Sequence, residues 1–77
     1  MNRLMSIKEV AHQMGCSHVT IYRQVEVGTM IQPIRMGNRV LFPDSEIGPI
    51  VNARIKGLDD EQIKQLVIEL IGKRGEL

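Results

Sequence analysis

The chain has few cysteine and aromatic residues, which stabilise many small proteins. Its 77 residues include one cysteine, one tyrosine, one phenylalanine and no tryptophan. A single cysteine excludes an internal disulfide, which suits a reducing compartment. No apolar run has the length of a signal peptide or a membrane helix. We therefore expect a cytoplasmic protein that does not associate with membranes.

Residues that carry catalysis or bind metals are also scarce. His12, Cys16 and His18 are the best metal candidates, but their spacing matches no standard zinc pattern and they offer three ligands at most. No nucleophile–base pair, paired carboxylates or phosphate-binding loop is visible, and a chain of this length has little room for a catalytic cavity. We expect no enzyme activity, no metal and no cofactor.

The net charge is only +1, but it is unevenly distributed. Residues 1–42 contain five basic and two acidic residues, a net charge of +3, whereas residues 43–77 contain five basic and seven acidic residues, a net charge of −2. This asymmetry favours a polyanionic partner for the first half. The small excess argues against tight non-specific binding to nucleic acid by one copy.

Two short helices are predicted near the start of the chain, with a connection of only a few residues between them. Ser6 can cap the first, and Glu9 lies three residues later, which makes a capping box. Gly15 can end this helix in a left-handed conformation. The pattern predicts a helix over residues 7–14.

The second helix is predicted over residues 18–27, between the cap Ser17 and the stop Gly28. Ile21 and Val25 lie four residues apart on its inner face. Its outer face carries polar and basic side chains: His18, Thr20, Arg23 and Gln24. Such side chains hydrogen-bond to base edges and phosphates, so the pair reads as a helix-turn-helix that enters a DNA major groove. The alternative is a helical hairpin whose polar faces are simply solvated.

After the second helix, the spacing of apolar residues changes from helical to alternating, which predicts a β-hairpin. If Ile34, Met36, Val40 and Phe42 share the core face, Met36 must oppose Val40 and Ile34 must oppose Phe42. That register leaves a three-residue loop at 37–39. We expect strands near 34–36 and 40–42.

A two-residue turn is the competing register. It would place Arg39 and Leu41 on the core face and bury a charge, so we favour the first register. The favoured register sends Arg35 and Leu41 to the outer face and Arg39 to the tip. A basic hairpin that follows a helix-turn-helix is typical of a wing, which can reach the phosphate backbone or the minor groove.

Two further helices are expected, near 46–56 and 60–71. The third has an apolar stripe and ends at Gly57. A start near Asp44 or Ser45 would place Pro49 inside this helix, so either the helix starts later, near Gly48, or its first turn is irregular. The fourth is capped by Asp59 or Asp60 and has a wide apolar stripe, which is formed by Ile63, Leu66, Val67, Ile68, Leu70 and Ile71. We expect the residues after this helix to fray.

The expected fold is therefore mainly α with a small β-hairpin: a winged helix-turn-helix over residues 1–57 and a C-terminal helix within 58–77. That helix either packs on the domain or mediates association. The residues expected to be buried are Val10, Met14, Ile21, Val25, Ile34, Val40, Phe42, Ile47 and Val51.

Four stretches of the chain resemble the AlpA-like and excisionase-like small DNA-binding proteins, which have a MerR-type helix-turn-helix. These stretches, which fall within about residues 4–56, are Met5–Ala11, Gly15–Arg23, Met36–Phe42 and Ser45–Ile47. The resemblance implies a winged protein of a phage or mobile element that binds double-stranded DNA near attachment sites or promoters. It would act as an excisionase, that is, a recombination directionality factor, as a transcriptional regulator, or as both.

The chain departs from that family at four positions. His18 stands where arginine is usual, and Val19 where a small polar residue is usual. Asn38 stands where the family often has a basic residue, and Leu41 where it often has a polar one. Each change removes charge or polarity from the expected DNA side, although Val19 can contact a thymine methyl group.

The residue types and the resemblance together define a candidate DNA-binding set: Ser17, His18, Val19, Thr20, Tyr22, Arg23, Gln24, Arg35, Asn38 and Arg39. Arg23 is the strongest candidate, against the alternative of a solvated helix arginine. Tyr22 is as consistent with a purely structural role. Further partners to consider are an integrase and other copies of the chain in a cooperative array on DNA. The competing function is an adaptor that keeps this shape but binds a protein such as an integrase without strong DNA binding.

Overall fold

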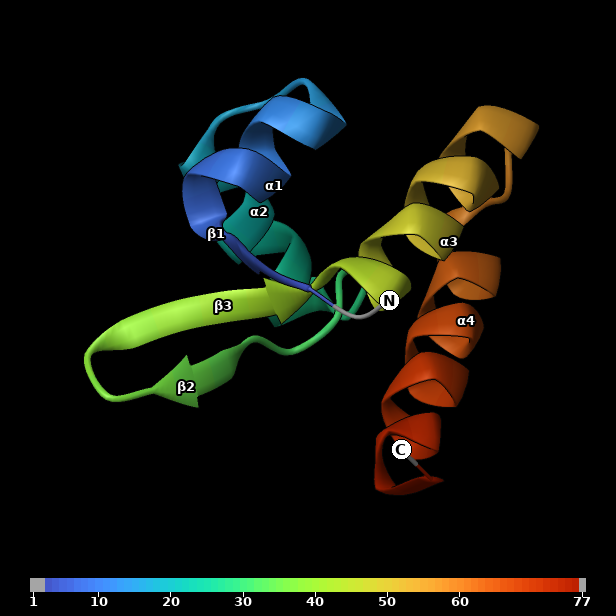
Figure 1. Ribbon diagram of the computed structural model, residues 1–77. Coiled ribbons are helices and arrows are strands. Elements are labelled where there is room, and N and C mark those ends of the chain that lie inside the picture. The colour runs from blue at the N-terminus through green and yellow to red at the C-terminus, as the bar shows by residue number, and fades with distance from the viewer. Residues whose placement is uncertain (1–2, 77) are drawn as a thin grey trace.

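The computed structural model describes residues 3–76 and is mainly helical, with a small three-stranded antiparallel sheet (Figure 1). Along the chain the elements are β1 (Leu4–Ser6), α1 (Ile7–Met14), α2 (His18–Val27), β2 (Ile34–Met36), β3 (Arg39–Pro43), α3 (Asp44–Lys56), α4 (Asp60–Gly72) and the 3-10 helix η1 (Lys73–Glu76). The expected helices over 7–14 and 18–27 are confirmed, and that over 60–71 is one residue longer. The expected fraying after α4 is wrong in part, because η1 occupies most of that segment. Within residues 3–76, no helix is long and apolar enough to cross a membrane.

The capping box expected before α1 is present. The Glu9 backbone N–H donates to Ser6 Oγ at 3.2 Å, and the Ser6 backbone N–H donates to Glu9 Oε1 at 3.1 Å. The hydrogen bond from the Ser6 backbone, and then that from Arg3, lowers the pKa of the Glu9 carboxyl. Gly15 ends the helix at φ 68°, a left-handed conformation that glycine adopts without strain.

A strand that the sequence analysis did not predict, β1, makes the hairpin part of a sheet. The strand order is β1-β3-β2, and Met5 lies opposite Phe42. The pairing continues past the strand, because the Asp44 backbone N–H donates to the Arg3 carbonyl at 2.7 Å and the Arg3 backbone N–H donates to Asp44 Oδ1 at 2.8 Å. These bonds tie the start of the chain to the start of α3.

The favoured hairpin register is wrong, and the two-residue turn is the one observed. Ile34 lies opposite Leu41, and Met36 lies opposite Arg39. The turn is Gly37–Asn38, with Gly37 at φ 62° and no positive φ at Asn38. A glycine at the first central position of a two-residue loop is typical of a type II′ turn, whose twist suits a hairpin.

The burial argument for the other register fails because the hairpin extends beyond the core (Figure 1). Met36 and Arg39 are both exposed, so pairing them buries no charge. Leu41, expected on an outer face, is buried, although it lies outside the main core cluster. Near its base the sheet is therefore apolar on both faces. The alternation of apolar and polar residues could for this reason not decide between the two registers.

Helix α3 begins at Asp44 and continues through Pro49. The start near Asp44 or Ser45 is confirmed, whereas the bounds of 46–56 begin two residues late and the start near Gly48 is wrong. Pro43 occupies the N-cap position and makes no side-chain cap hydrogen bond. Pro49 has no N–H to donate to the Ser45 carbonyl, which costs the helix one hydrogen bond. The bonds between Arg3 and Asp44 hold this first turn from outside.

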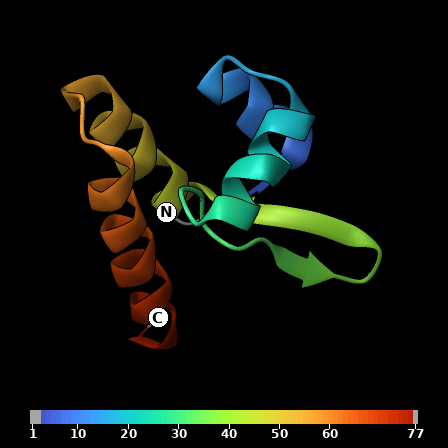
Figure 2. The ribbon, with the colours of Figure 1, turned by 180° about the vertical axis from the view of Figure 1, so that it is seen from behind.

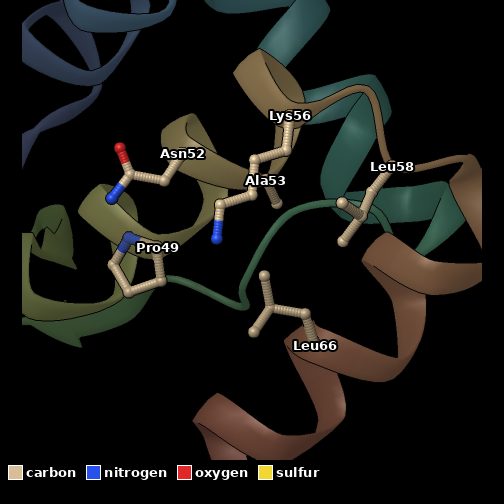
Figure 3. Close-up of a pocket in the computed structure, with 6 residues that line it drawn as sticks. All are labelled: Pro49, Asn52, Ala53, Lys56, Leu58 and Leu66. Atoms are coloured by element: carbon tan, nitrogen blue, oxygen red, sulfur yellow. The ribbon is translucent and has the colours of Figure 1, made fainter.

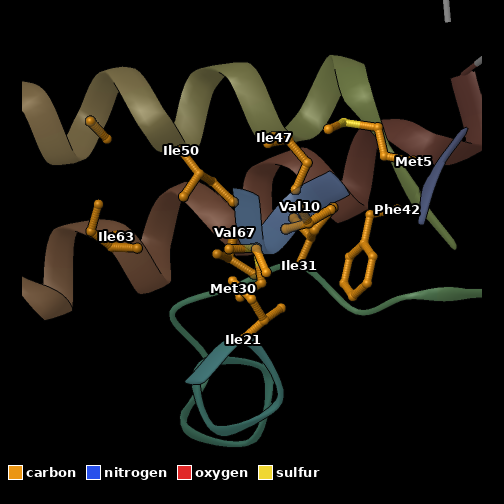
Figure 4. Packing of buried hydrophobic residues seen from close by; sticks show 12 residues of the cluster. Met5, Val10, Ile21, Met30, Ile31, Phe42, Ile47, Ile50, Ile63 and Val67 are labelled. Carbon is orange, nitrogen blue, oxygen red and sulfur yellow. The ribbon is translucent and has the colours of Figure 1, made fainter. Parts of the chain in front are cut away.

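One apolar core joins nearly every element (Figure 4). Of the residues expected to be buried, Val10, Ile21, Phe42 and Ile47 are buried, whereas Met14, Val25, Ile34, Val40 and Val51 are only half-buried. The core also contains residues outside the expected set: Met5, Ala11, Met30, Ile31, Ile50, Ala53, Ile63 and Val67. Because Ile63 and Val67 belong to α4, this helix completes the core of residues 1–57.

A buried ion pair fastens the C-terminal segment. Arg74 of η1 donates to both carboxylate oxygens of Glu46, at 2.8 and 2.6 Å, and to the carbonyl of Gln32 at 2.7 Å. The side chain of Glu46 is 7% exposed, and its carboxylate raises the pKa of the Arg74 guanidinium. Arg74 therefore holds together η1, α3 and the segment that precedes β2.

Replacing Ile21 by alanine should destabilise the protein by about 2–4 kcal/mol, because a side chain that is 1% exposed leaves a cavity. Urea denaturation followed by circular dichroism measures this loss. Val19→Ala, at an exposed position of the same helix, serves as the control and should change stability by less than about 0.5 kcal/mol. Equal stabilities for the two variants would contradict the inner-face position of Ile21.

Replacing Arg74 by methionine should destabilise the protein by about 2–3 kcal/mol, since it leaves the Glu46 carboxylate buried without its partner. Adding Glu46→Gln to this variant should recover part of the loss, because the amide needs no counter-charge. The same denaturation experiment on the parent, the two single variants Arg74→Met and Glu46→Gln, and the double variant tests this coupling. Additive losses would show that the ion pair contributes nothing of its own.

Candidate nucleic-acid interface

Helix α2 is defined by local signals at both ends. Ser17 caps it, with Oγ accepting from the Thr20 backbone N–H at 3.3 Å and lying 3.1 Å from the Thr20 hydroxyl. Gly28 ends it at φ 90°, a conformation that disfavours other residues. Ser17 is exposed, but its side chain already serves the helix, so it offers DNA little beyond the exposed N-terminus of α2.

The exposed face of α2 carries four of the candidate residues. His18, Val19, Tyr22 and Arg23 all lie in solvent, with Val19 55% and Tyr22 41% exposed. Positions 18 and 22, and 19 and 23, are four residues apart, so these side chains form one continuous surface. This surface, which we call the α2 face, combines one cation, two rings with polar groups and one branched apolar side chain.

Gln24 and Thr20 do not belong to the α2 face, contrary to the outer-face position expected for them. Both are half-buried. Gln24 Oε1 accepts from Arg54 Nη2 at 3.1 Å and from the Thr29 hydroxyl. Gln24 therefore links α2 to α3 and is occupied within the protein.

The hairpin places Arg35, Asn38 and Arg39 in solvent, as a wing requires. Because Arg35 lies opposite Val40, whereas Arg39 lies opposite Met36 one position away, the two arginines project from opposite faces of the hairpin. Asn38 belongs to the turn, and Arg39 is the first residue of β3 rather than part of the loop. The tip thus presents two cations on two sides of a narrow ribbon.

The basic residues fall into two groups by their partners. Arg3, Arg54, Lys64 and Arg74 each make an ion pair. The other six make none across the described part of the chain: Lys8, Arg23, Arg35, Arg39, Lys56 and Lys73. The three arginines among them are exposed, so their charges are available to an external anion. Glu26 is an exposed acid at the C-terminal end of α2, which directs any polyanion toward the N-terminal half of that helix.

Helix α2 and the hairpin lie at the same end of the molecule, and α4 lies at the other (Figures 1 and 2). In Figure 2, α2 lies directly above the base of the hairpin, whose tip points away from all four helices. The N-terminal charge excess is therefore also a spatial one.

Two hollows open beside α3. One, of about 320 Å³, is lined by Met14, Cys16, Thr20, Ile21, Gln24 and Arg54, and we call it the Arg54 hollow. The other, of about 380 Å³, lies between α3 and α4, where the Lys56 side chain extends over it toward Pro49 (Figure 3). Neither hollow contains the residues of the α2 face.

Arg54 is the residue that sequence reasoning missed. Its guanidinium contacts Gln24 at 3.1 Å and Asp60 at 3.2 Å, and so connects α2, α3 and the start of α4. It lies in the last turn of α3, where any cation is favourable, so its position alone does not indicate these contacts. No spacing rule relates it to Gln24, which lies thirty residues earlier.

The residues considered as metal ligands do not meet. Among residues 3–76, no three histidine, cysteine, aspartate or glutamate side chains lie close enough together to hold an ion. Cys16 is a half-buried free thiol that packs against the core.

No family model, curated protein or solved structure matches this chain. Any functional assignment therefore depends on the site itself and on the motifs of the sequence.

Proposed function

We propose that the protein binds double-stranded DNA as a winged helix-turn-helix, with α2 in the major groove and the β2–β3 hairpin as the wing. The observation that carries this proposal is that Arg23 of α2 and Arg35 and Arg39 of the hairpin are all exposed and make no ion pair among residues 3–76. An arginine fork is suited to phosphate oxygens and to the guanine edge.

Different parts of the site have different roles in this proposal. Arg23 and His18 face base edges from α2, and Val19 packs against a thymine methyl group. Arg35, Asn38 and Arg39 contact the backbone beside the groove. Tyr22, which is 41% exposed on the α2 face, has its hydroxyl available to a phosphate.

The biological role follows from the resemblance of residues 4–56 to AlpA-like and excisionase-like proteins. We propose an excisionase, a transcriptional regulator, or both, encoded by a phage or mobile element. With a net charge of +3 over residues 1–42, one copy makes few phosphate contacts and binds weakly at physiological salt. Occupancy of DNA then depends on neighbouring copies or on a partner such as an integrase.

The exposure of apolar side chains favours a second candidate. Val19 is 55% and Ile68 63% exposed, and both suit a protein surface better than a phosphate backbone. In this alternative the chain is an adaptor for an integrase and has no strong affinity for DNA. Binding experiments on the arginine variants separate the two functions.

Arg23→Ala should weaken binding to a cognate duplex by about 1–3 kcal/mol and relax the preference at one or two base pairs. Arg39→Ala should instead weaken binding to every duplex alike and reduce the slope of log K against log salt by about one. Fluorescence anisotropy at two salt concentrations measures both effects. Lys73→Ala, which removes an exposed charge from η1, is the matched control and should change neither quantity. Unchanged affinity and salt slope in both arginine variants, with the fold intact, would favour the adaptor.

Ile68→Ser should remove cooperativity between adjacent DNA sites without unfolding the protein, because this side chain on α4 is 63% exposed. A deletion of α4 would not test cooperativity, because Ile63 and Val67 belong to the core and their loss would unfold the protein. Titration of one-site and two-site duplexes gives the per-site affinities. Ile55→Ser, at a 78% exposed position of α3, is the control and should leave cooperativity in place. Identical per-site affinities of the parent protein on the two duplexes would show that the copies bind independently.

A further inference from the structure

We propose that the Arg54 hollow binds a small amphipathic carboxylate, whose anionic group pairs with Arg54 and whose apolar body lies against Met14, Cys16 and Ile21. This site uses none of the residues of the α2 face or the wing. It would therefore exist whether or not the protein binds DNA.

The walls of the hollow suit an apolar body. Ile21 is a core residue, while Met14 and Cys16 are half-buried and pack against the core from the end of α1 and the following turn. Sulfur-containing side chains are polarisable and make favourable contacts with aromatic rings. The volume of about 320 Å³ is at the lower end of the range for ligand pockets, which suits a single ring with a short acidic arm.

The polar rim of the hollow suits an anion. Its polar lining residues are Thr20, Gln24 and Arg54, and none of the lining residues is acidic. The Thr20 hydroxyl already faces Ser17 Oγ, so the Gln24 amide group and the guanidinium are the principal donors. A carboxylate that replaced Gln24 Oε1 as a partner of Arg54 would exchange a neutral acceptor for a charged one, which strengthens the hydrogen bond.

Arg54 is also pre-oriented for such a ligand. Its contacts with Gln24 and Asp60 hold the guanidinium on the rim, and its side chain is 34% exposed. Asp60 does not neutralise it effectively, because that carboxylate is 72% exposed and its pairing is screened by solvent. Lys56 at the second hollow is an exposed cation on a flexible stem and lacks the fork that a carboxylate matches (Figure 3).

The test uses phenylacetate and its neutral analogue phenylacetamide, followed by amide NMR of the full chain. Phenylacetate should shift the signals of Cys16, Thr20 and Gln24 in a saturable way, with a Kd on the order of 1 mM. Phenylacetamide, which has the same ring but no charge, should bind about tenfold more weakly. Arg54→Gln should remove the preference for the acid, whereas Lys56→Gln, which removes a charge two residues away on the same helix, should retain it.

A second measurement needs no variant, so it remains valid if Arg54→Gln fails to fold. Alkylation of Cys16 by iodoacetamide should become severalfold slower in saturating phenylacetate but not at the same concentration of phenylacetamide. Three results would overturn the proposal: no saturable shifts up to about 20 mM, equal affinity for the acid and the amide, or shifts confined to Arg23, Arg35 and Arg39. The last would indicate only general anion binding by the exposed arginines.

Discussion

The structure depends on a single apolar core, which is too small to be separated into parts that are stable on their own. Strand β1 provides Met5, α2 provides Ile21 and β3 provides Phe42, while α3 and α4 close the core from the other side. A chain of 77 residues buries a modest share of its unfolded surface, so each of these elements is needed for stability. The C-terminal helix is therefore a structural part of the domain rather than an appendage.

Strand β2 and the short helix η1 are the described elements that add no residue to the core cluster. The ladder with β3 holds β2, and Arg74 holds η1 through Glu46 and Gln32. This difference leaves the hairpin tip free of packing constraints. Arginines can extend from both of its faces at little cost to the fold, and a ribbon of this kind can adjust to a partner.

Arginine side chains divide the molecule into a structural and an exposed set. Arg54 and Arg74 make contacts between elements distant in the chain, and both are partly shielded from solvent. Arg23, Arg35 and Arg39 are exposed on α2 and the hairpin, and they make no ion pair within the described residues. The proposals for DNA and for a small carboxylate thus concern different arginines, and each can fail without the other.

The sequence by itself determined the helices, since their signals are local. Ser6 and Glu9 mark the start of α1, Ser17 and Gly28 enclose α2, and the capping box of Asp59 with Gln62 starts α4. Each signal acts within about four residues and does not depend on the rest of the fold. Of the outer-face residues that the periodicity predicted on α2, His18 and Arg23 are exposed, whereas Thr20 and Gln24 are half-buried.

Only the tertiary structure decided which faces of these elements meet. Strand β1 depends on β3, some forty residues later, and three residues carry too weak a pattern to predict it. The hairpin register depended on how far the ribbon extends beyond the core, and the orientation of Gln24 depended on Arg54. These outcomes arise from contacts between distant segments, whose geometry no local spacing encodes.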